Sequence, residues 1–258
     1  MGIVKALDEA DMPQASVEIL DRVEKYIGKR GTNLQRVMAH TPPYFGALMD
    51  LHFHVMPSRK LRRAVKEAIA VAVSMCNGCA YCIHAHAHVL KSMFHWTDAR
   101  LVELADVVAH VSGLNAFERA YLIDLNGLHL DVTLHDADHV PLLAEIEQTL
   151  GTLPLYYQVM AGDVSHLTGV WEREKAAMTQ GELPSLDKAL YALATSVTNG
   201  ASYSVQLRHT LCRRAGVTDE QLMEALQVVE LFNNNNRFTA GLQLEPSLTP
   251  TAVEPSAT

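Results

Sequence analysis

The sequence predicts an all-α fold made of two pseudo-repeated helical units. Apolar residues recur at intervals of three and four along most of the chain, which is the period of an amphipathic helix. No segment shows the sustained apolar–polar alternation of a half-buried strand, so a sheet is not expected. In addition, the chain matches itself without a gap when it is shifted from Val37 to Val159, which indicates an internal duplication.

The first helices are predicted from their ends. Apolar residues at helical spacing over 17–27 stop at Gly28, a residue that can take the left-handed conformation that closes many helices. Pro42 and Pro43 can open the next helix, because proline fits the first helical turn, with Thr41 as its cap.

The middle of each copy contains a long apolar helix and a second helix behind it. A helix is expected over 61–75, and Asn77-Gly78 separates it from the helix that begins near Cys79. The last helix of each copy is expected to begin at a threonine cap, at Thr97 in the first and at Thr218 in the second.

These elements divide the chain into four parts. We expect a cysteine-bearing unit over 1–112, a connecting segment over 113–138 and a cysteine-less unit over 139–245. A separate helix is predicted over 116–129, within the connection. The remainder, 246–258, is rich in proline, serine, threonine and alanine and is expected to be disordered.

The two copies keep their framework and differ at four reactive positions. The ungapped match runs from Val37 to Val107 and retains many apolar and small residues. The reactive side chains are replaced together in the second copy: Cys79 by Ala201, Cys82 by Ser204, His86 by Arg208 and Glu67 by Ala189. This joint loss indicates that the four residues act as a unit.

Length, composition and charge limit the function classes. A chain of 258 residues with 48% hydrophobic and 19% charged residues can bury a large core. The net charge of −8 argues against a nucleic-acid surface, and the short basic cluster over 59–63 is expected to be a solvated helix face. With no secretory signal pattern and no apolar run of the roughly 18 residues that span a bilayer, we expect a cytoplasmic protein without a membrane partner.

The motif around Cys79 predicts thiol chemistry. On a helix, Cys79, Cys82 and His86 share one face. A thiol reacts as the thiolate, which the positive end of a helix favours and an imidazole can help to form. Glu67 can orient that imidazole or receive its proton through a water. Oxidation of one thiol to a sulfenic acid, followed by condensation with the other, would give a disulfide.

The same four residues also match a family signature. The spacing Glu-x11-Cys-x2-Cys-x3-His, filled by Glu67, Cys79, Cys82 and His86, resembles the active-site pattern of the alkylhydroperoxidase D-like (AhpD-like) proteins in the carboxymuconolactone decarboxylase superfamily. The close resemblance covers 61–107. It implies an all-α AhpD-like fold and cysteine-based reduction of hydroperoxides with neither a metal nor another cofactor.

The resemblance also implies roles and partners. Cys79 would attack the peroxide, Cys82 would resolve the sulfenic acid, and His86, through water to Glu67, would relay the proton. The electrons would come from a dithiol or a thioredoxin- or lipoyl-type donor. The chain would assemble into a homo-oligomer, as a trimer or a dimer of two-unit chains.

Other interpretations remain open. The protein could be a decarboxylase-type lyase or isomerase that uses His86 and Glu67 while the thiols stay idle, or a redox-sensing assembly protein. Zinc is a weaker alternative, because Cys79, Cys82 and the nearby histidines lack a second ligand pair at the usual spacing. Tyr81 has a counterpart at Tyr203, where no thiol exists, which favours a structural role for it.

Overall fold

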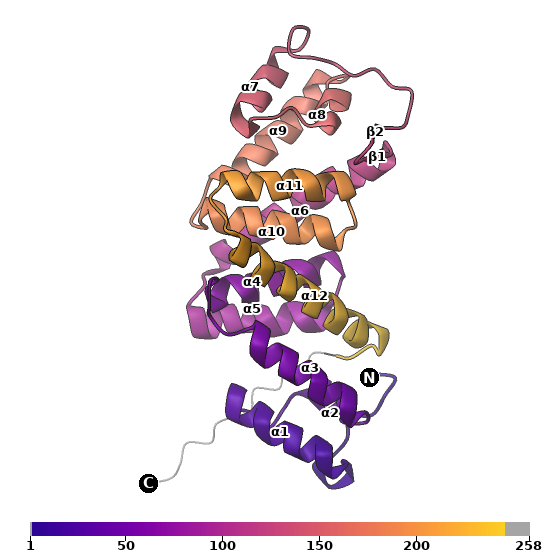
Figure 1. Ribbon diagram of the computed structural model, residues 1–258, viewed down its shortest axis with the longest axis vertical. Helices are drawn as coiled ribbons and strands as arrows, with labels where there is room; N and C mark the ends of the chain where they lie inside the picture. The colour runs from indigo at the N-terminus through magenta and orange to yellow at the C-terminus, as the bar shows by residue number, and fades with distance from the viewer. Residues whose placement is uncertain (1, 246–258) are drawn as a thin grey trace.

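The computed structural model describes residues 2–245, so the tail predicted to be disordered lies outside the described residues. Nearly all of the regular secondary structure in the described chain is helical, as predicted, and the helices form an elongated stack (Figure 1). A 3-10 turn at Glu9–Asp11 precedes the α-helices: α1 (Gln14–Ile27), α2 (Asn33–Met38), α3 (Pro42–Val55), α4 (Arg63–Cys76), α5 (Ala80–Phe94), α6 (Asp98–Ala120), α7 (Pro141–Leu150), α8 (Leu155–Met160), α9 (Val164–Thr179), α10 (Ser185–Thr198), α11 (Ser202–Arg214) and α12 (Asp219–Gly241).

Most of the predicted helix ends are confirmed. α1 ends at Gly28, which has a φ of 72°, and α3 begins at Pro42. Thr41 precedes α3 but its side chain does not cap the helix; the hydroxyl instead donates to the carbonyl of Met38 at 3.4 Å. Its cap role was therefore predicted wrongly.

The threonine caps of α6 and α12 are present. The Thr97 hydroxyl accepts a hydrogen bond from the amide of Arg100. At α12, Thr218 and Gln221 form a complete capping box, each side chain accepting from the other residue's backbone amide.

The two repeats correspond in register up to their last helices. The helices α2 to α5 begin 122 positions before α8 to α11, as in the sequence match, but α6 and α12 begin at Asp98 and Asp219, 121 positions apart. The reason is that α11, with 13 residues, is two residues shorter than α5, with 15, while the linker after α11 is one residue longer than the linker after α5. Leu104 therefore corresponds to Ala225 and not to Leu226, which corrects the ungapped alignment at its end.

The connection between the repeats contains a hairpin where a helix was predicted. The expected helix over 116–129 is absent, because α6 continues to Ala120 and two short antiparallel strands follow, β1 (Ile123–Asp124) and β2 (Gly127–Leu128). The Asp124 carboxylate accepts from the amide of Asn126 at 2.7 Å and closes the turn locally.

The last helix of each repeat packs against the other repeat. α6 contacts α10, α12 contacts α4, and α4 and α10 pack on each other in the middle of the molecule (Figure 1). As a result, the start of α5 meets α12, although the two are far apart in the sequence. For example, Cys79 contacts Thr239, which lies 160 residues further along the chain.

Two buried lysines hold α12 and α6, the last helices of the repeats, against the opposite repeat, an arrangement called here the exchange of the last helices. Lys66 Nζ lies 2.8 Å from Glu224 Oε2 on α12 and also donates to the carbonyls of Val55 and Pro57. Lys188 makes the corresponding pair with Glu103 on α6 at 2.6 Å. Both ammonium groups are buried, and a buried charge is tolerated only with such partners.

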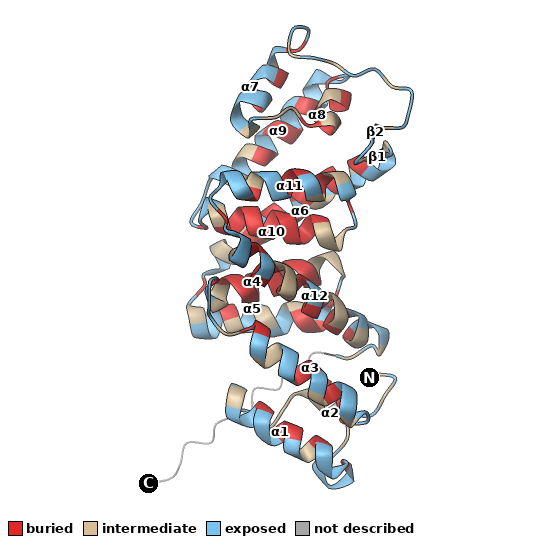
Figure 2. Ribbon diagram, in the orientation of Figure 1, coloured by how far each residue is buried: buried red, intermediate tan, exposed pale blue. Residues whose placement is uncertain are grey.

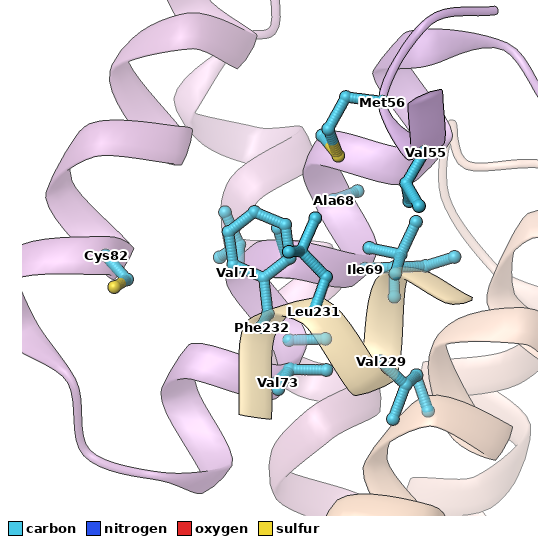
Figure 3. Close-up of a cluster of buried hydrophobic side chains, with 14 of the residues drawn as sticks. Val55, Met56, Ala68, Ile69, Val71, Val73, Cys82, Val229, Leu231 and Phe232 are labelled. Atoms are coloured by element: carbon cyan, nitrogen blue, oxygen red, sulfur yellow. The ribbon is translucent and has the colours of Figure 1, made fainter. Parts of the chain in front are cut away.

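The main core is shared between the repeats. α4 and α10 are the most completely buried helices, and their alanines allow close helix approach (Figure 2). Figure 3 shows Val71 and Val73 of α4 in one cluster with Leu231 and Phe232 of α12. A smaller core lies at the far end, around α7, α8 and α9, and is centred on Trp171. Each fully buried aliphatic side chain contributes about 1.5–3 kcal/mol.

Candidate active site

The backbone places both cysteines at the amino end of α5. Gly78 has a φ of 66°, which ends α4 in the predicted turn, and the amide of Cys79 then donates to the carbonyl of Ser74 at 2.9 Å. Cys79 is the residue that precedes the first turn of α5, and Cys82 lies within that turn. Both are unpaired thiols and both are buried.

Thr239 from the second repeat lies between the two sulfurs. Its Oγ1 is 2.9 Å from Cys79 Sγ and 3.5 Å from Cys82 Sγ. The hydroxyl also lies 2.9 Å from the carbonyl of Asn235, one turn earlier on α12. It can therefore donate to that carbonyl while it accepts from a thiol, or rotate its proton toward a thiolate.

The arrangement favours one thiolate and one thiol. A hydrogen bond from the Cys82 thiol is the main cause that lowers the pKa of Cys79 to about 6, against the opposing effect of burial. The Thr239 hydroxyl, the backbone amide of Cys82 and the charge of His86 act in the same direction. The pKa of Cys82 is raised, because its proton is held by the Cys79 sulfur and because it is buried. With a pKa near 6, about nine-tenths of Cys79 is ionised at pH 7.

The predicted carboxylate and imidazole are in direct contact. Glu67 Oε2 on α4 lies 2.6 Å from His86 Nδ1 on α5. The resemblance implied a connection through water, so the structure differs on this point. Burial alone would raise the pKa of Glu67, but the hydrogen bond from His86 and the guanidinium of Arg63 lower it. Arg63 Nε donates to Glu67 Oε1 at 3.1 Å.

The environment of His86 limits access to the sulfurs. Its ring packs edge-on against Phe232 of α12, with the centroids 4.5 Å apart. Cys79 and Cys82 are each only 2% exposed, whereas the His86 side chain is 16% exposed. Reactive cysteines are usually more open than this. An oxidant must therefore displace a neighbouring side chain to reach the pair, which favours small molecules.

Tyr81 has the structural role that was predicted from its counterpart. Its hydroxyl donates to Thr32 and accepts from the amide of Leu34 at the start of α2. In the second repeat, the Tyr203 hydroxyl accepts from the amide of Leu155 at the start of α8. Each tyrosine thus ties the helix after the Asn-Gly turn to the first short helix of its repeat.

The remaining cysteines and nearby histidines lie outside this cluster. His84 and His88 are exposed on α5, as expected for helix-surface residues. Within residues 2–245, no three His, Cys, Asp or Glu side chains come together in a way that could hold a metal ion. Burial raises the pKa of Cys76, and raises that of Cys212 to about 12, so neither thiol ionises readily at neutral pH.

In the second repeat, a carboxyl group binds the start of the helix that lacks the thiols. Glu118 on α6 occupies the position that corresponds to Thr239 on α12. It accepts from the amides of Tyr203 at 3.0 Å and Ser204 at 2.9 Å, and from the Ser204 hydroxyl. The backbone amides at the amino end of α11 are therefore bonded by a carboxyl group, where α5 carries the two sulfurs.

A second carboxylate–cation pair in this repeat comes from different helices. Arg208, which replaces His86, makes two hydrogen bonds to Glu174 at 3.0 and 3.1 Å. Glu174 lies on α9, whereas Glu67 lies on α4. Burial would raise the pKa of Glu174, but Arg208 and His110 together lower it well below its usual range. The second repeat therefore lacks the reactive residues but contains a buried ion pair.

Sequence reasoning missed Thr239 and Arg63. Thr239 is brought in by the exchange of the last helices, which no local pattern reveals. Arg63 belongs to the basic cluster over 59–63, which was expected to be a solvated face. The expected solvated helix face is only partly right. Within the cluster only Arg63 lies in α4, and both Arg63 and Arg62 have ion-pair partners, Glu67 and Asp187. The i, i+4 spacing of Arg63 and Glu67 was the available signal.

Comparisons with known proteins show the family and the fold. The model of the carboxymuconolactone decarboxylase family matches residues 42–123 and 166–244, one segment in each repeat and more than half of the chain. The chain belongs to the carboxymuconolactone decarboxylase family. The family resemblance predicted from the four motif residues is thus confirmed, as is the all-α, repeated fold. No curated protein matches the chain.

Two solved structures share the fold. One is the alkylhydroperoxidase AhpD core of an uncharacterized peroxidase-related protein from Ralstonia eutropha JMP134, with 19% identity and a TM-score of 0.53, covering 95% of this chain and 92% of that one. The other is a candidate gamma-carboxymuconolactone decarboxylase subunit from Burkholderia xenovorans LB400, with 19% identity and a TM-score of 0.63, covering 90% and 97%. Among the described residues, no helix is long and apolar enough to cross a membrane.

Proposed function

We propose that this member of the family is a thiol-dependent peroxidase that uses Cys79 and Cys82 as a redox pair. The observation that carries the proposal is the cluster at the start of α5, where the pKa of Cys79 is lowered to about 6 by its contacts with Cys82 and Thr239. The Glu67–His86 contact supplies a proton-transfer group beside it. None of these side chains is kept at the equivalent positions of the other repeat, where Glu118 stands in the position of Thr239.

The reaction proceeds in three balanced steps. The Cys79 thiolate attacks one oxygen of the hydroperoxide, the O–O bond breaks, and the released alkoxide takes a proton to give the alcohol or water. The Cys82 thiol then attacks the sulfenic acid, forming the disulfide and releasing water. An external dithiol reduces the disulfide and becomes oxidised in turn. His86, held by Glu67, carries the proton to the leaving oxygen.

The test is turnover of a hydroperoxide by the full chain with dihydrolipoamide as the electron donor. Cys79→Ser and Cys82→Ser should each abolish turnover, while Cys76→Ser, which changes a thiol outside the cluster, should keep it. Hydrogen peroxide should react faster than cumene hydroperoxide, because both sulfurs are only 2% exposed. Full turnover in either of the first two variants would refute the proposal.

A lyase or isomerase function is the second candidate. The observation in its favour is the direct Glu67–His86 contact, which forms an oriented base that needs no thiol. The two functions respond differently to alkylation of the cysteines, which should abolish peroxide turnover but leave a lyase active. Slow reaction with one equivalent of peroxide and no turnover would instead indicate a redox sensor.

The cellular setting follows from the proposed chemistry. A dithiol or a thioredoxin- or lipoyl-type donor would be available in the cytoplasm, which is the compartment that we propose. We also propose assembly as a trimer or dimer of two-unit chains, to be tested by light scattering. These proposals involve no metal, cofactor, nucleic acid or membrane.

A further inference from the structure

A cavity of about 400 Å³ lies between α1 and α5, beside the candidate active site. Ile27, Val89 and Met93 give it apolar walls. The rest of its lining is polar, and no carboxylate among residues 2–245 belongs to it. The lining includes four basic side chains, Lys29, Arg63, His84 and His88, and four hydroxyl-bearing ones, Tyr26, Thr32, Tyr81 and Ser92. The cavity is within the size range of small-molecule sites, which are mostly apolar with a few converging polar groups.

The basic groups of this cavity are available to a ligand. Among the described residues, the side chains of Lys29, His84 and His88 have no hydrogen-bond or ion-pair partner. Arg63 uses Nε to hold Glu67 and lies over the ring of Tyr26, at 5.7 Å from its centroid. The two terminal nitrogens of this guanidinium have no acceptor within residues 2–245. A planar pair of free N–H donors suits a carboxylate.

The second repeat provides an internal comparison, because it lacks these basic groups. The positions of Arg63, His84 and His88 are occupied there by Ser185, Gln206 and Thr210. Lys29 follows the glycine that ends α1, and the residue after the equivalent glycine of α7 is Thr152. All four basic groups therefore occur only in the repeat that carries the thiols. A general requirement of the fold would have kept them in both repeats.

We propose that this cavity binds an amphipathic organic anion, with its carboxylate at Arg63 and Lys29 and its apolar chain along Ile27, Val89 and Met93. The proposal does not depend on the peroxidase function. It does have a consequence for that site, because Arg63 also holds Glu67. A bound carboxylate would share the guanidinium with the Glu67–His86 pair.

The test is isothermal titration calorimetry of the full chain with octanoate, and with octan-1-ol as the uncharged probe of equal chain length. Octanoate should bind at least tenfold more tightly than octan-1-ol. Lys29→Met should weaken octanoate binding about three- to tenfold, a range typical of one partly exposed ion pair, and Arg63→Met should weaken it more. Lys25→Met, which removes an exposed lysine of α1 outside the cavity, should change it less than twofold.

The proposal is overturned by any of three results. These are the absence of octanoate binding, equal affinity for octanoate and octan-1-ol, and equal effects of Lys29→Met and Lys25→Met. Because Lys29 is exposed in a loop, its replacement leaves the fold intact, and thermal denaturation of each variant checks this. Weaker octanoate binding in Lys29→Met with unchanged peroxide turnover would support the anion site independently of the proposed function.

Discussion

Replacing Thr239 by valine should raise the pKa of Cys79. The substitution keeps the shape of a fully buried side chain and removes the hydroxyl that lies 2.9 Å from Cys79 Sγ. A hydrogen bond to a charged group contributes about 1.5–3 kcal/mol, and one pKa unit corresponds to about 1.36 kcal/mol. The pKa of Cys79 should therefore rise from about 6 to about 7–8.

The consequence at neutral pH is a smaller fraction of thiolate. At pH 7, ionised Cys79 should fall from about nine-tenths to between one half and one tenth, which slows alkylation about two- to tenfold. The assay is the pH dependence of iodoacetamide labelling at Cys79, followed by mass spectrometry. The midpoint of this curve reports ionisation, and restricted access to the buried sulfur scales the rate without moving the midpoint.

Two variants serve as controls for this experiment. Thr239→Ser keeps the hydroxyl and should keep the midpoint near pH 6. Thr168 is an exposed residue of α9 whose hydroxyl donates to the carbonyl four residues earlier, as the Thr239 hydroxyl does. Thr168→Val therefore removes the same kind of hydrogen bond within a helix at a position far from the thiols. If Thr239→Val folds normally and its midpoint stays at about pH 6, the second repeat takes no part in activating the thiol.

Three further predictions test the relay, the exchange of helices and the buried ion pair. Glu67→Gln removes the charge that holds His86, so peroxide turnover should fall about tenfold at pH 7 while the thermal midpoint changes little; an unchanged rate would remove Glu67 from the relay. Lys66→Met removes the buried ammonium partner of Glu224, which keeps its contacts with Arg59 and with the amides of Lys60 and Leu61. The variant should lose about 3–5 kcal/mol of stability in urea unfolding, with a similar loss for Lys188→Met, and a loss below about 1 kcal/mol would contradict the role given to these pairs. Folding lowers the pKa of Glu174 below its ordinary value of 4.5, so its ionised form stabilises the protein above that pH, and this stabilisation is lost as the pH falls further. In Glu174→Gln the free energy of unfolding should therefore depend less on pH between 6 and 3, and the same pH dependence as in the parent chain would refute this role.

The sequence allowed much of the fold and four of the six residues of the candidate site to be predicted, for identifiable reasons. Helical periodicity and the Asn-Gly turn located α4 and α5, and the fixed spacing along them brought Glu67 near His86. Periodicity determines which face of a helix is buried, but not which helix covers it. The exchange of α6 and α12 between repeats was therefore not predicted, and neither was the contact of Thr239 with the thiols.

The comparison of the two repeats was limited in a similar way. Position by position, the carboxylate at Glu67 is lost in the second repeat, where Ala189 replaces it. In space, Glu174 supplies a carboxylate from another helix and pairs with Arg208. An alignment compares sites along the chain, whereas electrostatics requires only that opposite charges meet. This is why a buried ion pair persists in a repeat that has lost its thiols.

The most direct test of the central claim is mass-spectrometric mapping of disulfides in the full chain after exposure to less than one equivalent of hydrogen peroxide. We predict a single new linkage between Cys79 and Cys82, with Cys76 and Cys212 still reduced, and its complete reversal by dihydrolipoamide. Oxidation that begins at Cys76, or a chain whose Cys79 and Cys82 remain thiols while the peroxide persists, would contradict the account.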